Sequence, residues 1–156
     1  MANFRLTVNG KLTEVQAWDG DMPLLYALRN GLGLHAAKYG CGQGQCGACT
    51  VLLNDQPVRS CLIKLSAAAG QRVTTNEGLG TPEQPHPVQA AFITEQAAQC
   101  GYCTNGMVMS SVALLKRNAR PTREQAQVAL AGNLCRCGSH DRVLKAIARA
   151  SGQEAS

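Results

Sequence analysis

The sequence predicts an α+β fold in which a small mixed β-sheet carrying one helix is followed by an all-α bundle of four helices. Through much of the first half, apolar residues alternate with polar ones, as they do in half-buried strands, whereas from residue 88 onward they recur at helical spacing. Between the halves, the segment NEGLGTPEQPHP holds three prolines and two glycines and follows neither period, which indicates a connector. We therefore expect domains at residues 1–76 and 88–156, joined by residues 77–87.

The first half opens with a predicted β-hairpin and a short helix. Apolar and polar residues alternate over residues 4–17, and the pair Asn9-Gly10 tolerates the positive φ angles that a two-residue hairpin turn requires. Pro23 suits the first turn of a helix, leucines recur behind it at helical spacing, and Gly31 supplies a C-terminal stop. One helix is therefore expected after the hairpin.

Three more strands are expected after a glycine-rich loop that contains cysteines. Residues 50–53, 58–61 and 72–75 are the candidate strands, because they are rich in β-branched and apolar residues. The pair Asn54-Asp55 supplies a turn between the first two. Together with the hairpin and the helix, these strands predict a small sheet of the β-grasp type.

The second half predicts four helices. Apolar residues form a stripe at helical spacing over residues 88–92 and a longer one over residues 107–115. Thr122 followed by Gln125 is the capping-box pattern that begins a third helix, and Asp141 complements the start of a fourth. The apolar positions of the last two helices are expected to include Val128, Leu130, Val143, Leu144 and Ile147. Both cysteine pairs of this half fall in the connections between helices.

The composition is that of an ordinary folded chain with modest cores. Of the 156 residues, 45% are apolar but only 4% are aromatic, so Leu, Val, Ile and Ala must fill most of the interior. The bulky fillers are expected to be Phe4, Trp18, Tyr26, Phe92 and Tyr102. Because two domains of this size each bury little surface, bound metal would add stability that the cores lack.

The net charge of +5 is concentrated late in the chain. Between positions 116 and 149, eight basic residues face only two acidic ones, Glu124 and Asp141. A nucleic-acid surface would carry such a charge, but no RNA- or DNA-binding motif accompanies it. Solvated helix faces and contacts with the surface of a partner protein are therefore favoured, and no nucleic-acid partner is expected.

Neither an export signal nor a membrane span is expected. Residues 1–11 alternate apolar and polar positions where a signal peptide needs an unbroken apolar segment. No stretch reaches the roughly 18 to 20 consecutive apolar residues that cross a bilayer. Eight cysteines in such a chain favour reduced thiols in the cytosol, and hence metal ligands over disulfides.

The eight cysteines divide into two groups of four, and the first group has the spacing of a plant-type [2Fe–2S] ligand set. Cys41, Cys46, Cys49 and Cys61 follow the pattern C-x4-C-x2-C-x11-C, with Cys61 expected on the strand after the loop. The interleaved glycines let the backbone turn N–H groups toward a cluster with a formal charge of about −2. Zinc sites usually show paired C-x2-C ligands, and disulfides need an oxidising compartment, so both are disfavoured.

The second group, Cys100, Cys103, Cys135 and Cys137, leaves the metal open. A C-x2-C pair and a C-x-C pair separated by 31 residues suit a zinc site in a helical domain as well as an iron–sulfur cluster. Because both quartets are complete without histidine, His86 and His140 are expected to have structural or surface roles.

The segments around these cysteines resemble the iron–sulfur subunits of the molybdenum hydroxylases, the xanthine oxidase and aldehyde oxidoreductase family. The matching segments are KYGCGQGQCGACTV and RSCL in the first half, then AAQCGYCTNGMVMS and GNLCRCGSH in the second. Their order and spacing also match, so the resemblance spans nearly the whole chain, and it is similar in particular to the small subunits of bacterial isoquinoline and nicotinate oxidoreductases. It implies a ferredoxin-like domain followed by a four-helix domain, each with one [2Fe–2S] cluster.

By this resemblance, each group of four cysteines ligates one cluster. It also implies that Gln99 and Cys137 contact a molybdopterin, in its cytosine dinucleotide form, that a large partner subunit holds. Two departures from the family pattern stand out, because Asn105 occupies a position where many relatives have proline and residues 138–140 read Gly-Ser-His instead of the commoner Thr-Gly-Tyr. Neither removes a thiolate, but both weaken inferences about substrate from better-known members.

The implied role is that of the electron-transfer subunit of an oxidoreductase. Molybdenum on the partner would hydroxylate an aldehyde or an N-heteroaromatic compound, and electrons would pass through the second group's cluster and then the first to a cytochrome or flavin-containing acceptor. No catalytic residue and no direct membrane insertion are expected, and the location is expected to be cytoplasmic, with any membrane association through a partner. The alternatives are a free-standing two-cluster ferredoxin and a zinc-binding regulatory protein.

Overall fold

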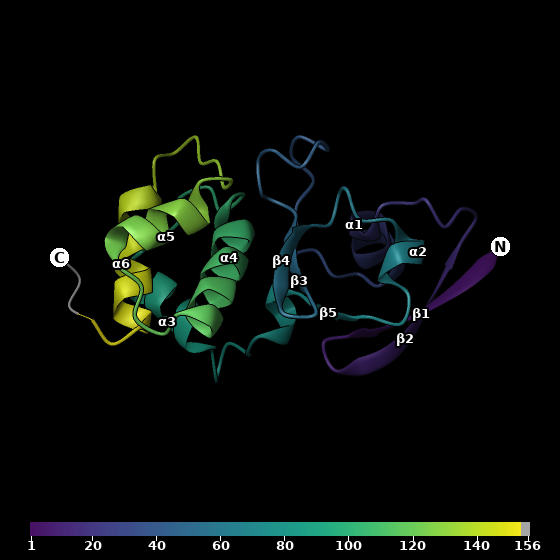
Figure 1. Cartoon of the computed structure of the whole chain (residues 1–156), viewed down its shortest axis with the longest axis horizontal. Helices are drawn as coiled ribbons and strands as arrows, with labels where there is room; N and C mark the ends of the chain where they lie inside the picture. The colour runs from purple at the N-terminus through teal and green to yellow at the C-terminus, as the bar shows by residue number, and fades with distance from the viewer. Residues whose placement is uncertain (154–156) are drawn as a thin grey trace.

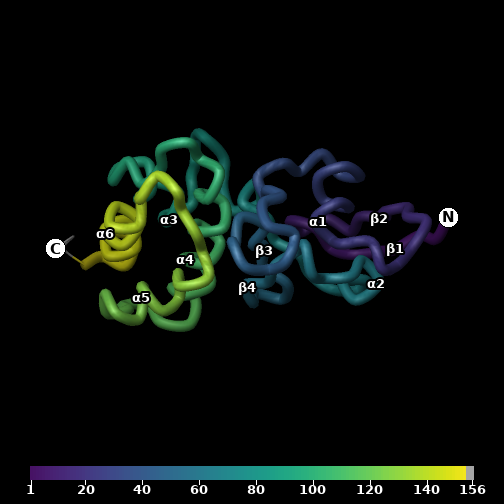
Figure 2. Tube along the Cα trace, turned by 90° about the horizontal axis from the view of Figure 1, so that it is seen from above, coloured from purple at the N-terminus to yellow at the C-terminus, as the bar shows by residue number. Residues whose placement is uncertain are grey.

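The computed structural model describes residues 1–153 and consists of a sheet half and a helical half that lie side by side along the long axis (Figure 1). The N-terminus lies at the outer end of the sheet half. Strands β3 and β4 lie at the centre of the molecule beside helix α4, as the view from above also shows (Figure 2). The two halves therefore meet along this strand pair and this helix.

The sheet half contains a five-stranded mixed sheet in the order β2-β1-β5-β3-β4. Its strands are β1 (Ala2–Val8), β2 (Lys11–Ala17), β3 (Thr50–Leu53), β4 (Gln56–Arg59) and β5 (Arg72–Thr74). β1 pairs antiparallel with β2 and parallel with β5, while β3 pairs antiparallel with both β4 and β5. The β-grasp-like arrangement predicted from the sequence is confirmed.

The predicted turns are confirmed as well. Asn9 and Gly10 both have positive φ, at 50° and 80°, and so do Asn54 and Asp55, at 48° and 67°. The Asn9 side chain also donates to Thr75 Oγ1 and accepts from the Thr75 N–H, each at 2.9 Å. The hairpin turn is thereby tied to the end of β5.

The predicted helix after the hairpin exists, but it is wound in two ways. α1 (Leu24–Tyr26) continues without a break into the π-helical turn η1 (Ala27–Gly31), so the segment between Pro23 and Gly31 is helical throughout. A further short helix, α2 (Leu65–Ala68), was not predicted, because four residues are too few to show a helical period.

The helical half contains four helices, as predicted. They are α3 (Pro87–Thr94), α4 (Thr104–Arg117), α5 (Arg123–Leu130) and α6 (His140–Ala150), preceded by the 3₁₀ turn η2 (Asn76–Gly78). The capping box of Thr122 and Gln125 at the start of α5 is confirmed. The segment expected to be an irregular connector thus contains one helical turn, and its last proline, Pro87, already belongs to α3.

Both histidines singled out in the sequence have structural contacts. His86 caps α3, since its Nδ1 accepts from the Val88 N–H at 3.2 Å and its own N–H donates to Gln89 Oε1 at 2.9 Å. His140 Nε2 lies 2.9 Å from the main-chain oxygen of Asn133. It therefore ties the first turn of α6 to the loop that precedes it.

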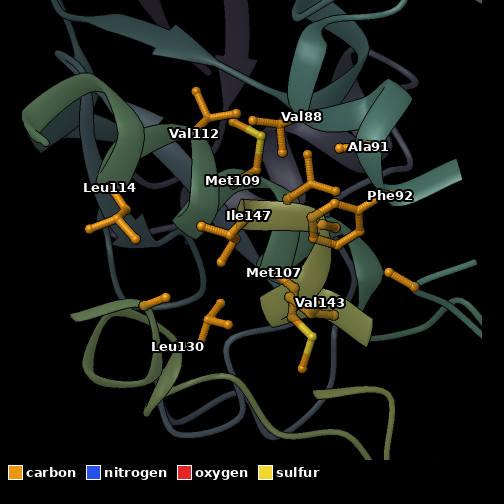
Figure 3. Close-up of a cluster of buried hydrophobic side chains, with 14 of the residues drawn as sticks. Val88, Ala91, Phe92, Met107, Met109, Val112, Leu114, Leu130, Val143 and Ile147 are labelled. Carbon is orange, nitrogen blue, oxygen red and sulfur yellow. The ribbon is translucent and has the colours of Figure 1, made fainter. Parts of the chain in front are cut away.

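The main apolar core of the helical half lies among its helices (Figure 3). Phe92 of α3, Met107 of α4 and Ile147 of α6 point into this core, and all three are buried. Leu52 of β3 is fully buried in the same core. The strand is thus packed into the helices, so the halves share apolar surface.

Three of the five aromatic residues expected in the cores lie at the surface. Phe92 is buried and Phe4 packs against the sheet core. Trp18, in contrast, is 87% exposed, and Tyr26 and Tyr102 are also exposed. The prediction failed because leucine, valine and alanine side chains already fill both cores.

Val128 was also misplaced, because it is 77% exposed instead of lying in the apolar stripe of α5. The buried residues of this helix are Ala126 and Leu130, which are four positions apart and share one face. A residue midway between them points away from that face. β4 likewise ends at Arg59, earlier than predicted, so Cys61 follows the strand instead of lying on it.

Several of the late basic residues form exposed ion pairs. The pairs are Lys116 with Asp55, Arg149 with Glu95, and both Arg123 and Lys145 with Asp141. Pairs of this kind contribute roughly 0–1 kcal/mol each, so they affect local charge more than stability. Within residues 1–153, no helix is long and apolar enough to cross a membrane.

A glycine on α4 permits the closest approach between the two halves. A Cβ placed on Gly106 would lie only 2.0 Å from the main-chain oxygen of Gly47 and 2.8 Å from Asn133 Nδ2. Both of these groups are held in the interface, so neither can move freely. The halves can therefore pack at this distance only with glycine here.

We predict that Gly106→Ala lowers the thermal unfolding midpoint, with a destabilisation of about 1–3 kcal/mol from overpacking. The sign is diagnostic, because Gly to Ala inside a helix normally stabilises it. Gly31→Ala is the matched control, since its Cβ would meet only Val15 Cγ1 at an ordinary 3.6 Å. A midpoint that rises in Gly106→Ala would contradict the proposed close contact.

Candidate metal centres

The first group of cysteines lies beside β3 and β4. Cys41, Cys46 and Cys49 come from the loop before β3, and Cys61 comes from the turn after β4. The structure brings them together, because Cys41 and Cys46 are joined by hydrogen bonds and the Cys61 thiol neighbours that of Cys49. Cys49 is buried and the other three are partly exposed.

Main-chain N–H groups converge on the sulfur of Cys41. Its Sγ accepts from the N–H groups of Gln43, Gln45 and Cys46 at 3.3, 3.2 and 3.3 Å, and the Cys41 N–H donates to Cys46 Sγ at 3.4 Å. The bonds from Gln43 and then Cys46 are the main cause that lowers the pKa of Cys41 to about 6. The loop thus stabilises a thiolate without a basic side chain among these donors.

Glycine is required in this loop for both conformation and space. Gly42, Gly44 and Gly47 have φ of 68°, 73° and 77°. A Cβ would lie 2.4 Å from Leu62 Cδ1 at Gly44 and 2.5 Å from the Gly132 main-chain oxygen at Gly47. The loop can therefore turn its N–H groups toward the sulfurs only with glycine at these positions.

The second group lies in the two loops of the helical half. Cys100 and Cys103 precede α4, and Cys135 and Cys137 precede α6. Cys135 Sγ accepts from the Ser139 N–H at 3.5 Å and lies 3.2 Å from Ser139 Oγ, and its thiol neighbours that of Cys103. Cys100 and Cys137 are exposed, so this group opens to the surface.

In each group, one thiol has a raised pKa and one a lowered pKa. Burial raises the pKa of Cys61 and of Cys103 to about 11, and the neighbouring thiols of Cys49 and Cys135 add to the effect. Burial also acts on Cys135, but the hydroxyl and N–H of Ser139 outweigh it and lower its pKa to about 6.

The two groups are directly linked across the boundary between the halves. The Leu134 N–H donates to the main-chain oxygen of Cys46 at 2.9 Å, and the Tyr102 hydroxyl donates to that of Tyr39. A cavity of about 280 Å³ lies between the groups. Its lining includes Cys41 and Cys46 of the first group and Cys100, Cys103 and Cys135 of the second.

The donor set fits a [2Fe–2S] cluster in each half. Such a cluster takes four thiolates, two at each iron, and is stabilised by hydrogen bonds to the sulfurs. Among residues 1–153, no three His, Cys, Asp or Glu side chains converge on one ion, as a mononuclear zinc site would require. The assignment of the eight cysteines as ligands stays a prediction.

Gln99 lies beside Cys100 on the exposed face of the second group. Its Nε2 is 3.5 Å from the main-chain oxygen of Cys137, at the outer limit of a hydrogen bond. The side chain therefore links the two loops of this group only weakly. Its predicted contact with a molybdopterin stays a prediction.

No sequence pattern indicated the side chains that hold the two groups together. Arg59 donates from Nη1 to Thr50 Oγ1 at 2.6 Å and from Nη2 to the Gly132 main-chain oxygen at 2.8 Å. Asn133 Nδ2 donates to the Gly47 main-chain oxygen at 3.4 Å. Neither spacing nor residue type marks such contacts, because the acceptors that join the halves are main-chain groups far away in sequence.

Comparison with known proteins places an iron–sulfur domain in each half. Residues 6–78 match the 2Fe-2S iron-sulfur cluster binding domain family, and residues 75–148 match the [2Fe-2S] binding domain family. The second group of cysteines, for which spacing left zinc and iron–sulfur open, thus falls within an iron–sulfur family.

Similar proteins cover almost the entire chain. The small component of nicotinate dehydrogenase from Pseudomonas putida is 56% identical over 94% of this chain and 92% of its own length. The alpha component of isoquinoline 1-oxidoreductase from Brevundimonas diminuta is 47% identical over 95% and 97%. The solved aldehyde oxidoreductase of Desulfovibrio desulfuricans superposes with a TM-score of 0.93 at 41% identity, over 97% of this chain but only 17% of that longer chain.

The pKa differences predict uneven reactivity of the thiols in the cluster-free chain. At pH 7.5, iodoacetamide should label Cys41 and Cys135 faster than Cys61 and Cys103, because a pKa of about 6 leaves a thiolate and one of about 11 does not. The lower nucleophilicity of an acidic thiolate reduces the difference to about tenfold.

Mass spectrometry of timed samples measures this order. All four thiols are partly exposed, so accessibility alone predicts similar rates and serves as the internal control. Equal labelling of the four would show that the hydrogen bonds to Cys41 and Cys135 do not stabilise thiolates.

Proposed function

The chain belongs to the family of iron–sulfur subunits of the molybdenum hydroxylases, and we propose that it carries electrons from a molybdopterin centre on a large partner subunit to an external acceptor. When bound, each [2Fe–2S] cluster supplies a site that takes up and releases one electron at a time. We propose Cys41, Cys46, Cys49 and Cys61 as the ligands of one cluster and Cys100, Cys103, Cys135 and Cys137 as those of the other. The domain division at residues 77–87 is part of this proposal.

The observation that carries the proposal is the hydrogen bond from the Leu134 N–H to the main-chain oxygen of Cys46. Leu134 is covalently adjacent to Cys135, so a ligand of each proposed cluster is connected to the other through a few bonds and one 2.9 Å contact. Such a contact keeps the two groups at a short and fixed separation. An arrangement of this kind suits transfer between the groups more than two independent sites.

The exposed face of the second group supports its place nearest molybdenum. Cys100, Cys137 and Gln99 are all exposed there, although a thiolate ligand is usually shielded from water. We propose that the large subunit covers this face and that Gln99 and Cys137 contact its molybdopterin, in the cytosine dinucleotide form. In that position the Gln99 amide can donate to and accept from the pterin.

The first group lies toward the acceptor in this proposal. Cys41, Cys46 and Cys61 are partly exposed, and Leu62 beside them is exposed as well. We propose that a cytochrome or flavin-containing chain receives the electrons here. This chain itself is proposed to hold no catalytic residue, because the substrate reacts at the partner's molybdenum.

The names of the two relatives support an N-heteroaromatic substrate over an aldehyde. One is named for nicotinate and the other for isoquinoline, and both are N-heteroaromatic compounds. We further propose a cytoplasmic location for the complex, with any membrane association through a partner, because eight cysteines proposed as ligands must stay reduced.

Purification of the native protein tests the function directly. We predict that a large molybdenum-containing subunit co-purifies with the chain and that the complex holds about four irons and four acid-labile sulfides per copy of this chain. Isolation as a lone iron–sulfur protein would favour the free-standing ferredoxin. Zinc without labile sulfide would instead favour a zinc-binding regulatory protein.

Replacement of one ligand in each group tests the pairing of the cysteines. Cys137→Ser should alter the electron paramagnetic resonance signal of the second cluster and spare that of the first, because serine replaces a thiolate in one group only. Cys41→Ser is the matched variant and should have the opposite effect. If Cys137→Ser changes the signal that Cys41→Ser also changes, the cysteines have been assigned to the wrong groups.

A further inference from the structure

Asn105 reaches from the helical half to the main chain on both sides of Cys49. It is the second residue of α4 and is only 4% exposed. Its Nδ2 donates to the main-chain oxygens of Ala48 at 3.0 Å and Thr50 at 3.1 Å. One amide group therefore holds the residues before and after the only buried cysteine of the first group.

The orientation of this amide follows from its partners. With two carbonyl oxygens at hydrogen-bond distance, only the nitrogen can face them, because an oxygen there would be repelled by both. Asn105 Oδ1 is then buried without a hydrogen-bond partner in the described part of the chain. Leaving a buried oxygen unpaired costs free energy, so helix stability alone does not account for this residue.

Proline, which stands at this position in many relatives, would suit the helix better. The first turn of a helix accepts proline, because N–H groups there have no partner within the helix. Proline has no donor, however, and could not bind the carbonyl groups of Ala48 and Thr50. Asparagine therefore provides a contact with the other half that the relatives' residue cannot make.

The main chain around Cys49 is held at three successive carbonyl groups. Asn105 binds those of Ala48 and Thr50, while the carbonyl of Cys49 accepts from the Ser60 hydroxyl at 2.7 Å. Fixing the peptide planes on both sides of Cys49 fixes the direction of its Cα–Cβ bond, and hence the position of its sulfur. Two of these three constraints come from α4.

We propose that Asn105 is a positioning residue for the first cluster, through which the helical half sets the geometry of a ligand in the sheet half. This inference rests on the proposed function, in which Cys49 is a ligand. The midpoint potential and the resonance signal of that cluster should then depend on a residue of the other domain.

The test compares Asn105→Leu with Asn118→Leu in the complete complex. Leucine matches the shape of asparagine but cannot donate, and Asn118 lies at the opposite end of α4, where it makes exposed hydrogen bonds to Gln125 and Arg120. Redox titration followed by electron paramagnetic resonance reports each cluster separately. We expect Asn105→Leu to shift the midpoint potential and g values of the first cluster, whereas Asn118→Leu should leave both at the wild-type values.

The second cluster distinguishes positioning from local damage. Asn105 is only two residues from Cys103, so a merely disturbed helix start would change the second cluster and spare the first. That outcome would overturn the inference, and so would two unchanged clusters. Asn105→Ser keeps one donor and should give an intermediate shift, which keeps the inference testable if Asn105→Leu does not assemble. Wild-type protein without labile sulfide would instead overturn the proposed function.

Discussion

The close packing of Gly47 against Gly106 is the constraint on which the rest of the molecule depends. A side chain at either position would collide with the opposite half, and Gly47 also needs its positive φ to complete the first cysteine loop. At this separation the main chain beside Cys46 meets that beside Cys135 through one hydrogen bond. The same contact that closes the interface therefore brings the two metal-binding loops together.

Main-chain groups supply much of the electrostatic stabilisation around the sulfurs. Three N–H groups converge on Cys41, and the N–H and hydroxyl of Ser139 act on Cys135. Peptide dipoles held by a rigid loop need no reorganisation when the charge of a bound group changes. This explains why the loop depends on glycine, since only glycine lets so many N–H groups point inward.

Local chemistry made much of the fold predictable, and long-range contacts limited the rest. Asn9-Gly10 specifies a hairpin turn and Thr122 with Gln125 a helix start, because both act on the backbone within a few residues. The exposure of Trp18 could not be predicted, since it depends on how completely other side chains fill the core. Likewise, cysteine spacing identified the candidate ligands, but nothing near Asn105 in the sequence indicates that it binds residues 48 and 50.

The relative placement of the two sites depends on the interface more than on the connector. Leu52 of β3 is buried in the helical core, and Arg59 reaches the main chain of Gly132. Lys116 at the end of α4 also pairs with Asp55 in the turn after β3. Contacts of apolar, hydrogen-bonded and ionic kinds thus join the halves at separate points. Rotation of one half about the connector would break all of them at once, so the two sites behave as parts of one rigid unit.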